Sequence, residues 1–330
     1  MSASFTRPPR PSQTHSDGHP IAGPIGASSW PSSRLVSGVP SQSGAANDGA
    51  HPGTTPVRRR VRTADLDAIR ERLSDRDWAV IRSVAEHQFL TGLQIAAFHF
   101  HDHAPASGPR IARRVLARLR ALRVLGALER RVGGIRAGSE GLIHYVDVVG
   151  DQLLRGRSGR TARRSREPSA RFVAHRLAVA DAHLALVRAH RDAAVDLIDC
   201  VVEPAAWRSY TGPGGARLTL KADLYAETGA GDDLSHAWFI EVDLGTESIP
   251  TLLKKCRDFE AYRRTGTEQE QAGGFPIVVW SVTHRSQQKA ADRRVALEKA
   301  IASDRSLPPQ LFRVIAPQQL TALLVGGGQL

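Results

Sequence analysis

The chain has 330 residues, of which 41% are hydrophobic and 24% are charged, and its formal net charge is +12. This length allows two domains, and two cysteines, Cys200 and Cys256, exclude a disulfide framework or a cysteine-bound zinc site. No apolar run approaches the roughly 18 residues that cross a membrane, and the first residues lack the apolar segment of a signal peptide. We therefore expect a cytoplasmic protein that makes no membrane contact.

The positive charge is concentrated in one third of the chain. Residues 58–170 contain 23 Arg and 12 acidic residues, a net charge of +11, whereas residues 171–330 contain 19 basic and 19 acidic residues and are neutral. An excess of positive charge confined to one segment is typical of a module that binds a polyanion. We therefore expect this segment to bind a polyanion, which the winged-helix order described below specifies as double-stranded DNA.

The first 63 residues are predicted to be a disordered tail. They are rich in Pro, Ser, Gly and Ala and show almost no aliphatic periodicity. The basic cluster RRRVR, residues 58–62, closes this tail. It is either a solvated linker or an additional contact to phosphate groups, and the sequence leaves both alternatives open.

Residues 64–150 are predicted to form a winged-helix domain. The spacing of apolar residues predicts three helices, over residues 74–90, 92–100 and 109–123. Two strands, over residues 125–131 and 142–149, flank the turn GGIRAGSEG. Three helices followed by a β-hairpin is the order of a winged helix, whose third helix enters the major groove of DNA. The alternative is a winged helix that is used for protein contacts.

Arginine residues follow one face of the third predicted helix and support the DNA-binding alternative. Arg110, Arg114 and Arg118 recur every four residues and share a face. The hairpin can contact the adjacent groove or the DNA backbone. Most arginine contacts in protein–DNA complexes go to phosphate, so no target sequence follows. The candidate DNA-binding residues are Arg110, Arg113, Arg114, Arg118, Arg120 and Arg136.

The remaining chain is predicted to be a basic linker, residues 151–170, and an α/β domain, residues 171–330. The linker is polar, contains six Arg and reaches Pro168 near its end. Beyond it the pattern predicts the order α-β-β-β-α-β-α-β-α, which makes a mixed sheet with helices on both faces. The predicted helices cover residues 171–191, 249–264, 287–303 and 317–324. The predicted strands cover residues 195–203, 218–225, 238–244, 275–282 and 311–315.

An acid-lined hairpin stands at the centre of this domain. Side chains alternate between the two faces of a strand. If the two strands pair, Asp223, Glu241 and Asp243 meet on one face beside Lys221. Such acid clusters bind divalent metal ions in phosphodiester-cleaving enzymes; the alternative is a solvated polar face. His175 in the preceding helix is expected to be a partly buried, hydrogen-bonded histidine rather than a ligand.

This order of elements resembles the PD-(D/E)xK nuclease superfamily, with Asp223 on the second strand and Glu241-Val242-Asp243 on the third. Its combination with an N-terminal winged helix is similar to the replication-relaxation family of actinobacterial plasmids and mobile elements. The resemblance also rests on HRLAVAD at residues 175–181 and on EVDLGTES followed by KKCRDFEAY, residues 241–262. It implies a restriction-endonuclease-like mixed sheet and a role on plasmid DNA in replication and DNA relaxation. It also implies Mg²⁺ bound by Asp223 and Glu241.

The third strand departs from that superfamily pattern at one position, because Asp243 stands where the pattern has lysine. The lysine orients or deprotonates the attacking water and stabilises charge on the phosphate. Lys221, Lys254 or Lys255 could replace it; otherwise the site is catalytically silent. The candidate catalytic residues are Asp223, Glu241, Asp243, Lys221 and Lys255.

The sequence thus predicts a DNA-binding accessory protein for plasmid or mobile-element replication and DNA relaxation, with a degenerate nuclease-like domain. One alternative is a Mg²⁺-dependent endonuclease or nickase that the winged helix directs to DNA. A transcriptional regulator is the other alternative. Replication or relaxation proteins and a second copy of the chain remain open as partners.

Overall fold

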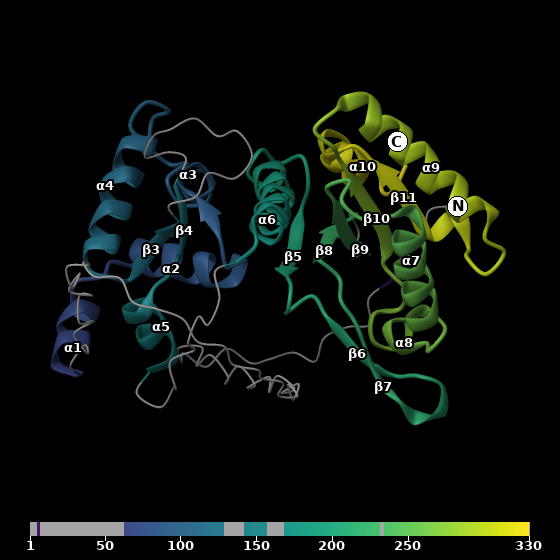
Figure 1. Ribbon diagram of the computed structural model, residues 1–330, viewed down its shortest axis with the longest axis horizontal. Helices are drawn as coiled ribbons and strands as arrows, with labels where there is room; N and C mark the ends of the chain where they lie inside the picture. Colours follow the sequence, from purple (N-terminus) through teal and green to yellow (C-terminus); the bar gives the residue numbers. More distant parts are fainter. Residues whose placement is uncertain (1–4, 7–62, 129–141, 157–167, 232–233, 330) are drawn as a thin grey trace, which may run out of the picture. The chain divides into compact units, whose positions relative to one another are not determined.

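The computed structural model describes residues 5–6, 63–128, 142–156, 168–231 and 234–329 (Figure 1). Nearly all of the predicted tail, with its RRRVR cluster, lies outside these residues. The same is true of Arg136 and of most of the predicted linker. Within the predicted tail, Phe5–Thr6 forms a two-residue strand, β1, and Thr63 begins the first helix.

The first part of the described chain contains the three predicted helices and the two predicted strands in the predicted order. It also contains an earlier helix, a short strand between the first two predicted helices and a helix after the hairpin, none of which was predicted. The helices are α1 (Thr63–Glu71), α2 (Asp75–His87), α3 (Gly92–His99), α4 (Gly108–Ala121) and α5 (Val148–Arg155). The strands are β2 (Leu90–Thr91), β3 (Leu125–Leu128) and β4 (Ile143–Val146), in the order β2-β4-β3. Ser74 and Thr91 each close a capping box, which explains why α2 and α3 begin where they do.

Helix α5 corrects the predicted hairpin and linker. Residues 148–149 were predicted to end a strand and residues 151–155 to begin the linker, but both belong to this helix. The Asp147 side chain accepts a hydrogen bond from the Val148 N–H and so caps the helix. Val149 and Leu153, one turn apart, are buried in the core formed with α2, α3 and α4. These two buried apolar side chains, one helical turn apart, therefore favour a helix over the predicted end of a strand and start of a linker.

The second part of the described chain is built on a mixed sheet. Its strands are β5 (Leu197–Val202), β8 (Leu224–Gly229), β9 (Leu234–Asp243), β10 (Ile277–Val282) and β11 (Phe312–Ile315). Their order is β11-β10-β9-β8-β5, and β1 pairs with the beginning of β9. The pairs β9–β10 and β10–β11 are parallel, whereas β5–β8 and β8–β9 are antiparallel.

Helices cover both faces of this sheet, as Figure 1 shows. They are α6 (Ala170–Arg191), α7 (Ile249–Arg263), α9 (Gln287–Ser303) and α10 (Leu320–Val325). The short helix α8 (Thr267–Ala272) follows α7. Phe239 of β9 shares a core with Phe259 of α7, whereas its neighbours Trp238 and Ile240 share a core with Val179 of α6. The alternation along β9 thus builds two cores, and the predicted α/β class with a helix-flanked mixed sheet is confirmed.

The predicted strand over residues 218–225 is wrong, because the chain changes sheets within it. Its first half is β7 (Arg217–Leu220), which pairs with β6 (Arg208–Thr211) in a separate hairpin, and β8 begins only at Leu224. The apolar alternation continues through the break, so the pattern alone does not reveal it. Lys221 lies in the break, exposed to solvent, with its Nζ 5.1 Å from the centre of the Trp207 ring.

Helix α6 contacts both parts of the described chain. Its Ala180 and Leu184 join the core of the N-terminal helices. Arg176 is almost fully buried and donates hydrogen bonds to the backbone oxygens of Glu86 and His87 at the end of α2. His183 Nδ1 lies 3.0 Å from His87 Nε2, and the two rings stack. Helix α6, through its cores and the hydrogen-bonded contacts of Arg176 and His183, therefore joins α2 to the part of the chain that contains the mixed sheet.

We expect this histidine contact to make the fold acid-sensitive. Burial lowers the pKa of His87 to about 4 and that of His183 to about 3. In the unfolded chain His87 and His183 bind protons below about pH 6.5, whereas in the folded chain they stay neutral until the pH approaches 4. The free energy of unfolding therefore falls as the pH drops from 6.5 towards 4. The loss is about 3 kcal/mol for His87 alone, at 1.4 kcal/mol per pKa unit.

Urea unfolding at pH 7.5 and pH 5 measures about 2 kcal/mol of this loss, because pH 5 lies about 1.5 units below the unfolded pKa of about 6.5. The His87→Gln variant should lose markedly less stability between the two pH values than the native chain does. Substitution of the exposed His101 by Gln is the matched control and should leave the pH dependence unchanged. An equal pH dependence in the native chain and the His87→Gln variant would contradict the prediction.

Candidate functional site

Ionisable side chains from three strands meet at one end of the mixed sheet. Glu203 follows β5, Asp223 precedes β8 and Glu241 lies near the end of β9. The Glu203 N–H donates to the Asp223 backbone oxygen at 3.0 Å, and the Val242 N–H donates to Asp223 Oδ2 at 2.8 Å. Asp223 and Glu241, predicted to meet, are thus brought together, and both are buried.

A lysine reaches this acid pair from helix α7. Lys255 Nζ pairs with Glu241 Oε2 and lies 3.8 Å from Asp223 Oδ1. Leu252, Cys256 and Phe259 mark the buried face of α7, so Lys255 also points inward. Lys254, its neighbour, is exposed and pairs with Asp258 at 3.0 Å. Of the three lysines considered from the sequence, Lys255 is the one beside the acids.

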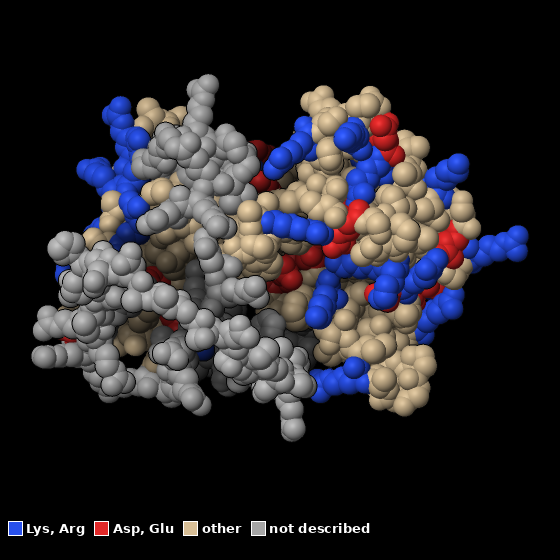
Figure 2. Space-filling model, viewed as in Figure 1, with Lys and Arg blue, Asp and Glu red and all other residues tan. Residues whose placement is uncertain are grey.

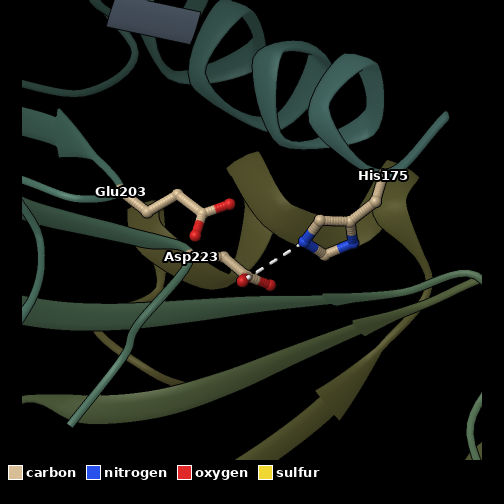
Figure 3. Close-up of side chains that lie close together, drawn as sticks. All are labelled: His175, Glu203 and Asp223. Atoms are coloured by element: carbon tan, nitrogen blue, oxygen red, sulfur yellow. Dashed lines mark hydrogen bonds and ion pairs between the residues drawn. The ribbon is translucent and has the colours of Figure 1, made fainter. Parts of the chain in front are cut away.

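Two further ligand groups approach Asp223 from the side of α6 (Figure 3). His175 Nε2 lies 3.3 Å from Asp223 Oδ1. One ligand atom from each of His175, Glu203 and Asp223 lies within 4.8 Å of the others, close enough for one metal ion. Glu203 also pairs with the buried Arg176. Glu203 was not predicted from the sequence, because a single acid after a strand has no motif or spacing to distinguish it.

Asp243 lies on the same face of β9 as Glu241 but has a different partner. Arg293 of α9 donates to both carboxylate oxygens of Asp243, and its Nη2 lies 3.1 Å from Oδ1. The same Nη2 also donates to the Glu247 backbone oxygen at 2.6 Å. The Gly245 N–H donates to Asp243 as well. The charge of Asp243 is therefore balanced within the fold.

The pocket above these groups has a volume of about 380 Å³. Its wall contains acidic, basic and aromatic side chains from α6, β9, α7 and β10. The residues relevant to the chemistry are Arg171, Phe172, His175, Asp223, Glu241 and Lys255. A pocket of this size is at the small end of ligand sites.

The two buried carboxylates of the pocket are coupled to each other and to the cationic groups beside them. Burial and the neighbouring Asp223 raise the pKa of Glu241 well above its ordinary value. Burial alone would raise the pKa of Asp223, but Lys255 and His175 hold it below its usual range. Burial would lower the pKa of Lys255, but Glu241 and Asp223 raise it. Lys255 is thus shared by two buried carboxylates. Burial would lower the pKa of His175, but Asp223 raises it, so His175 also stabilises the charge of Asp223.

An unpartnered oxygen shows where further positive charge would fit. Glu241 Oε1 is buried and has no hydrogen-bond partner among the residues that the structure describes. Carboxylate oxygens are the ligands that suit Mg²⁺ and Mn²⁺, and imidazole is a ligand for transition metals. Asp223 and Glu241, with His175 and Glu203 beside them, therefore fit a divalent metal ion.

The predicted DNA-binding arginines of α4 differ from one another in solvent exposure and in their partners. Arg110, Arg113 and Arg114 are exposed, and Figure 2 shows basic side chains gathered over the position of α4. Arg118 instead donates to both carboxylate oxygens of the buried Asp77 at 2.6 Å, within the capping box of α2. Arg120 is half-buried on the other side of the helix.

Comparison with known proteins identifies one family. The model of the replication-relaxation family matches residues 81–278, more than half of the chain. The chain belongs to the replication-relaxation family. Membership points to a role in plasmid replication or DNA relaxation. Curated proteins and solved structures give no match to this replication-relaxation protein.

The matched range of this replication-relaxation protein contains both candidate sites. It includes helix α4, the acids Asp223 and Glu241, and Lys255, whereas Arg293 and helices α9 and α10 lie beyond it. Within the described residues of this family member, no helix is long and apolar enough to span a membrane.

Proposed function

We propose that this replication-relaxation protein binds double-stranded DNA through a winged helix and cuts one DNA strand at a metal-dependent, PD-(D/E)xK-like site. In this proposal the winged helix comprises residues 64–150 and the nuclease-like domain residues 171–330. The observation that supports cleavage is Lys255, which brings an ammonium group to Asp223 and Glu241 from α7. The sequence pattern alone favoured a degenerate nuclease-like domain, because the strand that carries Glu241 has no lysine.

Asp223 and Glu241 would hold the metal ion, with His175 or Glu203 completing its ligand set. A bound Mg²⁺ would neutralise charge on the phosphate and lower the pKa of an attacking water. Burial of the two carboxylates keeps their charge unscreened by solvent, so the attraction for a cation is strong.

Lys255 would stabilise the negative charge that develops on the phosphate. Its own pKa is raised by the two acids, so it stays charged and acts as an electrostatic group rather than as a base. Hydrolysis adds one water across a P–O bond and leaves a phosphate monoester and a hydroxyl group. A cut in one strand lets supercoiled DNA rotate and relax, which agrees with the family's role.

The decisive experiment incubates supercoiled plasmid with the full chain in Mg²⁺, in Mn²⁺ and in EDTA. We expect open-circular DNA with either metal and none in EDTA. Asp223→Asn and Glu241→Gln should each lower the rate at least about a hundredfold, because even outer-shell partners of a metal contribute 10- to 100-fold. Glu298→Gln, an exposed acid on α9, is the matched control.

Two readouts separate loss of chemistry from loss of folding. Glu241→Gln removes a buried charge and keeps an oxygen for Lys255, so its free energy of unfolding in EDTA should stay within about 1 kcal/mol of the native value. DNA binding should be unchanged in both variants. Absence of product with every metal, with DNA binding intact, would support the silent accessory domain instead.

A further inference from the structure

Phe172 is an exposed aromatic side chain in the wall of the acidic pocket. Its exposed fraction is 42%, and it is the one aromatic among the large exposed hydrophobic side chains of the described residues. It lies three residues before His175 on α6, on an adjacent turn of the same face. A buried Phe89 contacts it edge-on, with the ring centres 6.2 Å apart and the planes at 88°.

The T-shaped contact supports the ring while 42% of the residue stays exposed to water. Phe172 therefore contributes less stabilisation by burial than a fully buried ring would. Arg171, the preceding residue, is 57% exposed and pairs with Glu247 at 3.4 Å, a weak surface contact with which a phosphate can compete. One wall of the pocket thus offers a flat apolar ring beside a cation, the pair of groups that recognises a nucleotide.

We infer that Phe172 stacks on an unpaired nucleobase next to the cleaved phosphate, and that the substrate of the pocket is a single-stranded or locally unpaired DNA strand. The inference rests on the proposed function and specifies its substrate. Bases within a duplex stack on one another and offer no face to Phe172, whereas every unpaired base does. Asp223 and Glu241 lie buried at a pocket of about 380 Å³, which suits one nucleotide rather than a duplex.

The same inference assigns a different form of DNA to each of the two proposed DNA-binding elements. The arginines of α4 would bind duplex, and the pocket would take a strand that has opened. Negative supercoiling favours strand opening, so supercoiled plasmid would be a better substrate than relaxed plasmid. Arg171 would contact the phosphate that precedes or follows the stacked base.

The test measures binding without cleavage. A single-stranded 15-mer with one 2-aminopurine, and the duplex made from it, are titrated with the full chain in EDTA and again in Ca²⁺. Stacking on a base contributes 1–3 kcal/mol, so Phe172→Ala should weaken binding of the single strand about fivefold to a hundredfold. It should also reduce the fluorescence change, while duplex affinity changes less than about twofold. Phe172→Trp should restore single-strand binding.

Val325→Ala, which shortens an exposed apolar side chain outside the pocket, is the matched control. Thermal unfolding of Phe172→Ala checks that the fold is retained. Undetectable binding of the single strand, unchanged single-strand affinity in Phe172→Ala, or equal losses for duplex and single strand would each overturn the inference. These outcomes do not depend on nicking: a chain that stacks bases but never nicks retains base stacking in this pocket and loses the proposed function, and a chain that nicks without stacking retains the proposed function and loses this inference.

Discussion

Substitution of Lys255 by Met should abolish metal-dependent nicking, with a rate at least about a hundredfold below that of the native chain. Removal of one preorganised group that stabilises transition-state charge costs about 10²–10³ in rate. Lys255 is the ammonium group that the structure places within 4 Å of Asp223 and Glu241. Nicking of supercoiled plasmid in Mg²⁺, followed by gel electrophoresis, measures the effect.

The neighbouring lysine provides a matched control. Lys254→Met makes the same chemical change one residue away, on an exposed side chain that pairs with Asp258, and nicking should stay within about twofold of the native rate. Retention of full activity in Lys255→Met would show that the Lys255–Glu241 pair has a structural role alone. In that case the accessory function would replace the nuclease.

Stability gives a second readout for Lys255→Met. Without the lysine two buried carboxylates remain side by side, and loss of one partner of a buried pair costs about 3–5 kcal/mol. Because Lys255 retains some exposure, the expected loss in EDTA is at the lower end of that range. Mg²⁺ should recover part of the lost stability, since ligand binding stabilises the folded state. A structural ion pair without a metal site would show no such recovery.

Local pattern was sufficient to predict the acids of this site. Alternation along β9 placed Glu241 and Asp243 on one face, and the expected pairing of two strands brought Asp223 to Glu241. Lys255 was a candidate through the resemblance, because a lysine of the nuclease superfamily can come from the following helix. The face shared by Glu241 and Asp243 follows from a period of 2.0 within one strand, whereas the position of Asp223 depended on a predicted strand that the structure corrects.

The partners from distant segments could not be predicted in the same way. Arg293 lies 50 residues after Asp243, and nothing in the sequence shows that its guanidinium balances that acid. The positions of Glu203 and Lys221 could not be predicted for a related reason, because the chain leaves the main sheet between them to form the β6–β7 hairpin. Register and choice of sheet are decided by tertiary packing rather than by local alternation.

Asp243 shows how the third strand accommodates an acid where the nuclease pattern has lysine. Arg293 binds its carboxylate from α9, so Asp243 adds no net charge to the pocket. Lys255, two turns into α7, supplies the cation from the other direction. In the proposed nuclease, Lys255 would supply the positive charge near Glu241 that the pattern places on the strand.

Replacement of Arg110 and Arg114 together by Ala should weaken duplex DNA binding more than about tenfold at low salt. Charge-assisted hydrogen bonds contribute about 1.5–3 kcal/mol each. Both side chains are exposed on α4 and have no partner among the described residues. Removal of each phosphate-binding arginine should also reduce the slope of log K against log salt by about 0.9, so the double variant should bring the slope closer to zero by about 2.

Two further variants are the controls for this experiment. Lys289→Ala with Lys299→Ala makes the same change in net charge on the exposed face of α9 and should leave the affinity within about twofold. Arg118→Ala should act mainly on stability, because it leaves the buried Asp77 without its cation. Its cost is about 1–3 kcal/mol, less than for a fully buried pair, since 42% of Arg118 is exposed to solvent. An unchanged affinity and salt slope in the Arg110/Arg114 variant would show that α4 is not the element that binds DNA, and the basic segment would then have to contact phosphate through other arginines.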